Sequence, residues 1–201
     1  MRTRFAIPLG TLLSALAACA DPGVSPADQR DPHHPASASA LVVPAAQPTY
    51  TQLDGAAARG TRGSLHLTVN TGGAIPRFPD AFILSVPVFG YAWVDVATGR
   101  GVVAVIHPAI GRDSRQNPQG WHTHPVLLGA GTASSNFCIG SIGTSQGGIS
   151  IQGEVLRLNM ALRQAGIPAA ALDAAAAFAV QPDAGCPPTG LGVVVLDLAS
   201  L

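Results

Sequence analysis

Segments in which apolar and polar residues alternate recur through most of the chain. In SLHLTVN (64–70) and in VLRLNMAL (155–162), every second residue is apolar. This two-residue period is typical of a β-strand with one buried face, because successive side chains of a strand point to opposite sides. Both segments are therefore predicted to be half-buried strands.

A second group of segments is apolar at most positions, rich in β-branched and aromatic residues, and bounded by glycine- or proline-containing turns. These segments are VFGYAWVDV (88–96), VVAVIH (102–107), WHTHPVLLG (121–129), FCIGSIG (137–143), ISIQG (149–153) and LGVVVLDL (191–198). They predict further strands, and the glycine-containing bend between the first two predicts a hairpin. AAAAFAVQ (174–181) is compatible with a helix through its alanines and with a strand through Phe178 and Val180.

About eight to ten short strands without alternating long helices predict an all-β fold, either an antiparallel β-sandwich or a barrel. One short helix near 165–176 is compatible with this fold. The composition agrees, because the chain has 23 glycines and 17 prolines, no lysine, and a single glutamate, Glu154. Residues that usually fill exposed helix faces are thus scarce.

The N-terminal segment has the organisation of an export signal. Two arginines precede an apolar stretch (5–15) that is too short to span a bilayer. It is followed by LAAC (16–19), which resembles the lipobox of bacterial lipoproteins. The resemblance implies removal of residues 1–18 as a signal peptide and attachment of lipid to Cys19. Because Ala20 and not aspartate follows the cysteine, it also implies the outer membrane, with the protein facing the periplasm or the cell surface.

Residues 19–50 are rich in Pro, Ala, Ser and Asp and show no period, so they predict a flexible tether before a folded domain at 51–201. The formal net charge of the whole chain is zero, and no basic stripe is interleaved with aromatic residues. Nucleic acid is therefore not an expected partner. The expected partner is the membrane, through the lipid anchor.

The cysteines predict one disulfide. If Cys19 carries lipid, Cys138 and Cys186 remain as a pair in an oxidising compartment. Two free buried thiols are the alternative interpretation.

Three histidines form a candidate metal site. His122 and His124 in GWHTHPV are two residues apart, so on a strand they point to the same side. His107 ends the preceding strand segment, and three neutral imidazoles would suit Zn²⁺ or Cu²⁺. Asp95 and Asp113 are further candidates, as a fourth ligand or as groups that orient a ligand. The alternative is that these histidines only form hydrogen bonds to the backbone or to Asp113.

The sequence favours a non-enzymatic role. GTSQG (143–147) fits the GxSxG pattern, but the residues after it resemble a strand and no histidine follows His124. With a histidine-bearing strand and FAVQ (178–181), the domain is similar to CHRD-type exported β-sandwich domains. The first hypothesis is a lipid-anchored envelope protein with a binding or scaffolding role. The alternative is an envelope protein that binds Zn or Cu through its histidine cluster, with or without catalysis.

Overall fold

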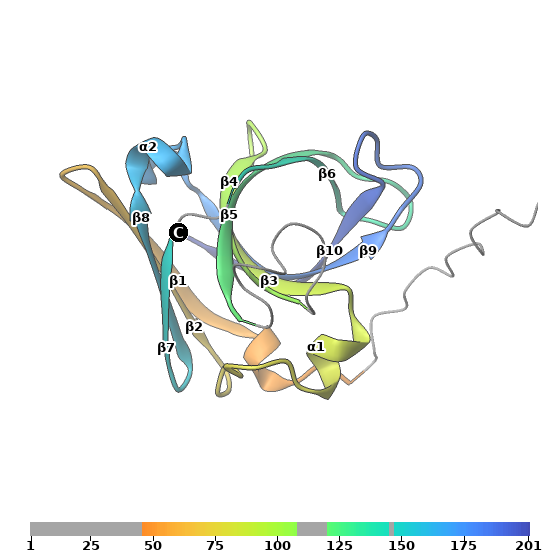
Figure 1. The fold of residues 1–201 in the computed structure, drawn as a ribbon, viewed down its shortest axis with the longest axis horizontal. Coiled ribbons are helices and arrows are strands. Elements are labelled where there is room, and N and C mark those ends of the chain that lie inside the picture. Colours follow the sequence, from red (N-terminus) through yellow and green to blue (C-terminus); the bar gives the residue numbers. More distant parts are fainter. Residues whose placement is uncertain (1–45, 108–119, 145–146) are drawn as a thin grey trace, which may run out of the picture. The chain divides into compact units, whose positions relative to one another are not determined.

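The computed structural model describes residues 46–107, 120–144 and 147–201 (Figure 1). The predicted signal peptide, the lipidation site Cys19 and most of the predicted tether lie outside the described residues. Asp113 and Ser145 also lie outside them.

The described elements are short and mostly strands. In chain order they are η1 (Thr49–Thr51), β1 (Leu53–Thr61), β2 (Ser64–Thr71), α1 (Ala81–Ser85), β3 (Val88–Asp95), β4 (Arg100–Ile106), β5 (His122–Ala130), β6 (Phe137–Ile142), β7 (Gly148–Gln152), β8 (Val155–Ala161), α2 (Leu162–Ala165), η3 (Ala169–Ala171), β9 (Ala174–Pro182) and β10 (Leu191–Ser200).

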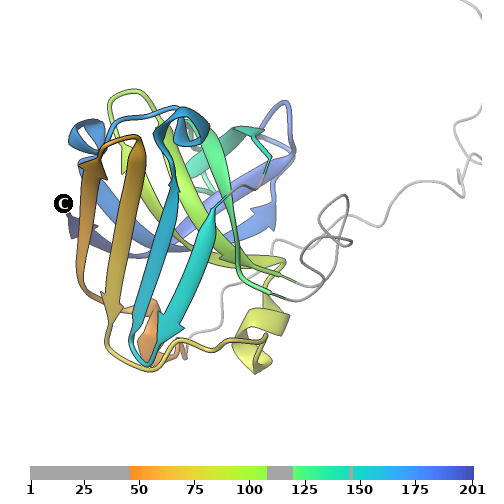
Figure 2. The same cartoon turned by 60° about the vertical axis from the view of Figure 1, so that its left-hand side comes forward.

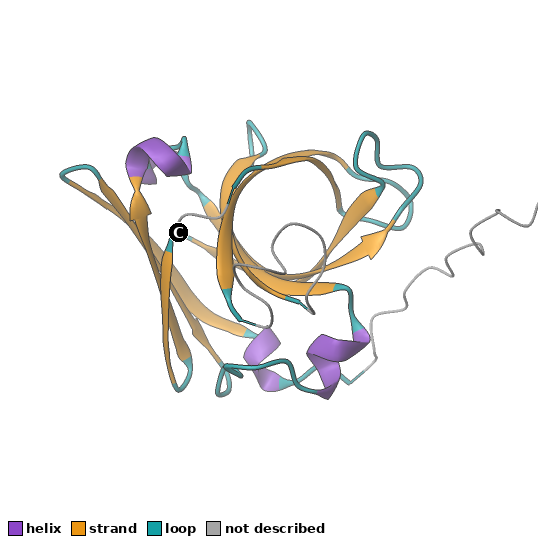
Figure 3. Ribbon diagram, in the orientation of Figure 1, coloured by secondary structure: helices purple, strands orange, loops and turns teal. Residues whose placement is uncertain are grey.

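The strands of the described residues form two antiparallel sheets (Figure 3). One is a four-stranded sheet with the order β1-β2-β8-β7. The other is a closed barrel with the order β10-β6-β5-β4-β3-β9, which Figure 1 shows nearly end-on. The predicted all-β fold is therefore confirmed, and it combines an open sheet with a barrel.

The alternating strands give the four-stranded sheet one apolar face. Leu67 of β2 pairs with Leu158 of β8, and both are about 1% exposed, whereas their neighbours in sequence are more accessible. This face packs in one apolar cluster with Tyr91 and Trp93 of β3, on the outside of the barrel. Burial of each large apolar side chain stabilises the fold by about 1.5–3 kcal/mol, so this layer is a main source of stability.

A second apolar cluster lies in the barrel interior. A strand that separates the two clusters is buried on both of its faces, and β9 is such a strand. Ala175 and Ala177 belong to the cluster between sheet and barrel, whereas Ala176, Phe178 and Val180 belong to the second cluster. The ambiguous alanine run is therefore a strand, in which Ala175 and Ala177 are the cross-strand partners of Trp93 and Tyr91.

The helices differ from the sequence prediction. α2 ends at Ala165, where the predicted helix 165–176 begins, because Gly166 adopts a left-handed conformation with φ 67° and Pro168 follows. Within 165–176 the structure has only the 3-10 turn η3 before β9 begins. α1 was not predicted; Asp80 caps it by accepting a hydrogen bond from the backbone N–H of Ile83 at 3.0 Å.

Within the described part of the chain, no helix has the length and hydrophobicity needed to cross a membrane.

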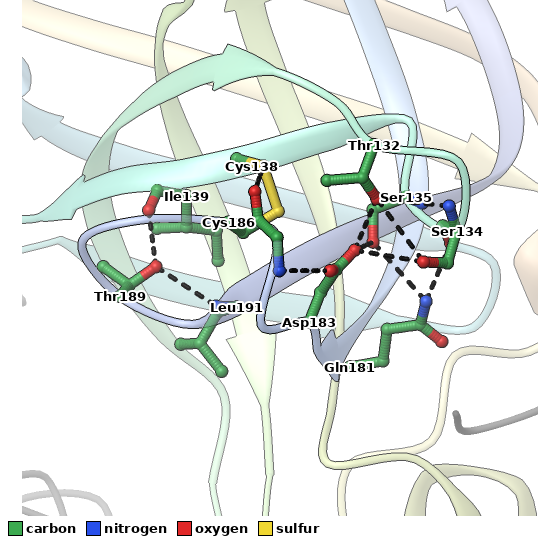
Figure 4. Close-up of a disulfide and its surroundings, with 11 residues drawn as sticks. Thr132, Ser134, Ser135, Cys138, Ile139, Gln181, Asp183, Cys186, Thr189 and Leu191 are labelled. Carbon is green, nitrogen blue, oxygen red and sulfur yellow. Dashed lines mark hydrogen bonds between the residues drawn. A yellow bond between two sulfur atoms is a disulfide. The ribbon is translucent and has the colours of Figure 1, made fainter. Parts of the chain in front are cut away.

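The predicted disulfide is present and lies at the weakest seam of the barrel. β6 and β10 share only two paired positions, Cys138 with Gly192 and Phe137 with Val193. Cys138 is bonded to Cys186 in the connection between β9 and β10, with an S–S distance of 2.06 Å (Figure 4). The covalent bond therefore braces the seam that closes the barrel.

Candidate functional site: a histidine row in the barrel

The segment that leads into β5 sends alternate side chains to opposite faces of the barrel wall. Trp121 packs in the cluster between the two sheets, where its ring stacks on Tyr91 with centroids 5.5 Å apart and an interplanar angle of 6°. Its Nε1 donates to the carbonyl of Pro76 at 2.8 Å. Thr123 Oγ1 accepts a hydrogen bond from the N–H of Gly147 at 2.8 Å. These contacts hold Trp121 and Thr123, the two residues that flank His122 in sequence.

His122 and His124 project to the other face, into the barrel. They pair in register with Val105 and Val103 of β4, whose side chains belong to the interior cluster. Because cross-strand partners share a face, both imidazoles lie on the interior side. His107, two residues after Val105, continues the same alternation. All three histidines are buried, with exposed fractions of 5%, 2% and 6% in chain order.

The three rings form a row with His122 in the middle, called the histidine row below. Nε2 of His107 lies 3.0 Å from Nε2 of His122, and the ring centroids are 4.7 Å apart. The ring of His124 follows, with its centroid 5.0 Å from that of His122. The structure thus places the three predicted histidines next to one another.

Backbone carbonyls set the tautomers of two of these rings. Nδ1 of His122 lies 3.0 Å from the carbonyl oxygen of Gly120, and Nδ1 of His124 lies 2.7 Å from that of Gly143. A carbonyl oxygen can only accept, so each Nδ1 donates its proton. In the neutral rings, Nε2 then carries the lone pair. The 3.0 Å contact is thus a hydrogen bond in which Nε2–H of His107 donates to Nε2 of His122.

Two of the three histidines lie at nearly the separation of metal ligands, but the set of ligands is incomplete. Two nitrogen ligands of a tetrahedral Zn²⁺ ion, at bond lengths of about 2.0–2.1 Å, lie about 3.3 Å apart. The two Nε2 atoms at 3.0 Å are near that separation. However, the described residues contain no group of three or more His, Cys, Asp or Glu side chains already arranged to hold a metal ion. Coordination by the third histidine would require a rearrangement of its ring.

Asp95 is not brought to the histidine row. It ends β3 and pairs with Arg100, whereas His107 follows the opposite end of β4, so the length of the β3–β4 hairpin separates the two residues. The carboxylate of Asp95 instead accepts hydrogen bonds from Thr98 Oγ1 at 2.6 Å and from the N–H of Ala97 at 3.0 Å. These bonds, above all the one from Thr98, hold the pKa of Asp95 below its usual value. Its interpretation as a metal ligand is therefore wrong, because it stabilises a turn.

A polar corner beside the disulfide was not found from the sequence. Asp183 Oδ2 accepts hydrogen bonds from Thr132 Oγ1 and Ser135 Oγ, both at 2.6 Å, and more weakly from Ser134 Oγ at 3.4 Å (Figure 4). Gln181 Nε2 donates to the carbonyl of Ser134 at 2.8 Å. These bonds tie the β5–β6 loop to the β9–β10 connection. Without a histidine or lysine among them to act as a base, the corner has the composition of a structural clamp.

The structure also disfavours the hydrolase pattern. The GxSxG segment is followed by strand β7, beginning at Gly148, and not by the helix that a nucleophile elbow requires. Ser145 itself lies outside the described residues.

Comparison of the chain with protein-family models, with curated proteins and with solved structures gives no match. Function is therefore inferred from the residues of the chain itself.

Proposed function

We propose that the chain is a lipid-anchored protein of the bacterial outer membrane that acts by binding, with Zn²⁺ or Cu²⁺ as the ligand of its histidine row. The observation that carries the metal assignment is the 3.0 Å approach of two buried imidazole Nε2 atoms beside a third imidazole.

Two features support export and anchoring. The LAAC segment (16–19) has the order of a lipobox. The bond between Cys138 and Cys186 fits an oxidising compartment, since cytosolic thiols are usually kept reduced. Lipobox-type cysteines typically carry more than one acyl chain, which is the condition for stable attachment to a membrane.

The hydrogen bonds around the histidine row support metal binding. Histidines that bind metals almost always donate their other ring N–H to a carbonyl or carboxylate, which fixes the ring and raises the basicity of the ligating nitrogen. His122 and His124 both make this bond, to Gly120 and Gly143. A metal ion held by Nε2 of His122 would take the place of the proton that His107 donates there. The chain would supply position and orientation, and His107 could join the ion through Nε2 only in its other neutral tautomer, with the proton moved to Nδ1.

A binding or scaffolding role without metal is the second candidate. It is favoured by the incomplete ligand set among the described residues. In that case the His107–His122 hydrogen bond satisfies two buried polar groups and fixes the ends of β4 and β5.

Metal analysis separates the two candidates. The complete chain with Cys19→Ala, which cannot be acylated, is purified and its metal content is measured after exposure to Zn²⁺ or Cu²⁺ and desalting. We expect near-stoichiometric metal, lost in His122→Ala and in His124→Ala. His66→Ala is the matched control, because His66 lies on the four-stranded sheet and contacts Thr61 Oγ1. Negligible metal in every protein would exclude the metal assignment and leave the scaffolding role.

Mass spectrometry of the native protein tests the anchor. We expect a chain that begins at an acylated Cys19, and transfer of the protein to the soluble fraction with Cys19→Ala. An intact Met1 and an unmodified thiol would contradict the proposal.

A further inference from the structure

The face of the four-stranded sheet that points away from the barrel carries a hollow with several polar side chains around it. Figure 2 shows β1, β2, β8 and β7 side by side as one continuous sheet. The apolar side chains of these strands point to the barrel side. On the opposite face, here called the outer face, a hollow of about 380 Å³ is lined by nine residues: His66, Leu67, Thr68, Gly148, Ile149, Ser150, Arg157, Leu158 and Asn159. Six of them, which alternate with Leu67, Ile149 and Leu158 along the strands, are polar or are glycine.

The strand register explains the hollow. His66 pairs with Asn159, and Asn159 pairs with Gly148, so these three positions form one row across β2, β8 and β7. Thr68, Arg157 and Ser150 form the adjacent row in the same way. Gly148 contributes no side chain and leaves one position of this grid open. A Cβ atom placed there would meet nothing closer than Asn159 O at 4.0 Å.

Arginines outnumber acids in and around this sheet. β2, β7, β8 and α2 contain no aspartate or glutamate, and Glu154 lies in the turn between β7 and β8. The one acid of β1, Asp54, lies at a bulge at the end of the strand remote from the β1–β2 turn. Four exposed arginines lie on this region or at its edge: Arg59 opposite His66, Arg62 in the β1–β2 turn, Arg157 in the hollow and Arg163 on α2.

We propose that the hollow binds an anionic saccharide, with Arg157 receiving a sugar carboxylate or phosphate. Arginine offers a planar fork of N–H donors that matches such groups, and charge-assisted bonds of this kind are among the stronger ones. Asn159, Ser150 and Thr68 line the same hollow. Their amide and hydroxyl groups can donate to and accept from sugar hydroxyls. This inference is independent of the histidine row, which lies inside the barrel.

The outer face is less suited to a lipid surface or to nucleic acid. The large apolar side chains that are exposed among the described residues all lie on other elements: Phe78, Leu84, Val96, Leu127, Ile142, Leu198 and Leu201. Peripheral membrane contact usually inserts such side chains into the headgroup region. The four strands also carry no Phe, Tyr or Trp on which nucleotide bases could stack. A hydroxyl-rich polyanion fits the donors that are present.

Retention on immobilised polysaccharides tests the inference. The complete chain with Cys19→Ala is applied to polygalacturonate, to a phosphorylated mannan and to neutral dextran. We expect salt-sensitive binding to one or both charged polymers and none to dextran. The charged polymer that binds more tightly identifies carboxylate or phosphate as the recognised group. Arg157→Ala is expected to weaken binding by about tenfold, which corresponds to the loss of one charge-assisted bond.

Two further variants make the test specific to the hollow. Gly148→Leu places a side chain at the open position, where a Cβ atom has ordinary clearance, and should weaken binding while the melting temperature stays unchanged. Arg100→Ala removes an exposed arginine from strand β4 of the barrel and should bind like the parent chain. Equal effects of Arg157→Ala and Arg100→Ala would show that only net charge matters and would overturn the proposal. So would binding to anionic lipid vesicles in the absence of polysaccharide binding.

Discussion

Trp121 connects the two layers of the fold. Its ring stacks on Tyr91 and contacts Phe89 edge-on, and its Nε1 donates to the carbonyl of Pro76. We predict that Trp121→Ala lowers the free energy of unfolding by about 3 kcal/mol, through lost burial and the cavity left behind. Trp121→Phe keeps most of the apolar contact, loses the hydrogen bond, and should cost about 1 kcal/mol. Equilibrium urea unfolding of the three proteins measures both values, and equal losses in the two variants would contradict this assignment.

Asp183 makes the stability of the fold depend on pH in the acidic range. Hydrogen bonds from Ser135 and, secondarily, Thr132 hold the pKa of Asp183 below its usual value. A carboxyl with a lower pKa in the folded state stabilises the fold fully above its unfolded pKa, about 3.9, and loses this contribution as pH falls through the folded value. We therefore predict that Asp183→Asn lowers stability at neutral pH and flattens the decline in melting temperature on the acid side. Melting curves between about pH 6 and pH 2 test this, and identical slopes would exclude it.

The residue-scale predictions succeeded where a short-range rule applied. Two histidines separated by one residue share a strand face in any register, so their proximity followed from the sequence. The orientation of each ring depends on carbonyls at Gly120 and Gly143, and the latter is 19 residues from His124. Nothing in the sequence indicates such a contact. Asp95 was misassigned because its distance from the histidines depends on which end of the hairpin it occupies.

At the scale of elements, the seam between β6 and β10 depends on its cross-link. Only two residue pairs join these strands, and the connecting disulfide spans 48 residues of sequence. In the chain-entropy model a loop of this length contributes about 4 kcal/mol, by restricting the unfolded chain. We predict that Cys138→Ala/Cys186→Ala lowers the free energy of unfolding by about that amount. The same melting temperature with and without reductant in the parent protein would contradict the prediction.

The strands that could be predicted are those in which apolar and polar residues alternate, because only one face of each is buried. The strands at 64–70 and 155–162 show a clean alternation, and β2 and β8 match them. β9 has no such pattern because both of its faces are buried, so helix propensity and strand burial compete in AAAAFAVQ. α1 depends on Asp80, whose carboxylate also accepts a hydrogen bond from Tyr50, 30 residues earlier in the chain. A tertiary contact of that kind has no local signature.

At the scale of the whole molecule, the sequence predicted a sandwich or a barrel without deciding between them. Barrel closure requires β9 to pair with both β3 and β10, and β10 to reach β6. The pairings of β9 with β3 and of β10 with β6 join segments far apart in sequence, and strand patterning contains no information about which strands become neighbours. The sheet and the barrel share an apolar cluster. We therefore expect sheet and barrel to unfold together in one cooperative transition.

Because sheet and barrel are expected to unfold together, metal binding at the histidine row should raise the free energy of unfolding of the whole folded domain. The histidine row joins residues at the ends of β4 and β5, and a site assembled by folding binds the folded chain in preference to the unfolded one. A ligand at a hundred times its dissociation constant then adds about 2.7 kcal/mol to the free energy of unfolding. We predict that Zn²⁺ or Cu²⁺ raises the melting temperature of the complete Cys19→Ala chain, that a chelator reverses the rise, and that His122→Ala abolishes it while His66→Ala does not. The same rise in His122→Ala would place the metal elsewhere, for example at the adjacent pair His33 and His34 in the predicted tether, and would exclude the histidine row as the site.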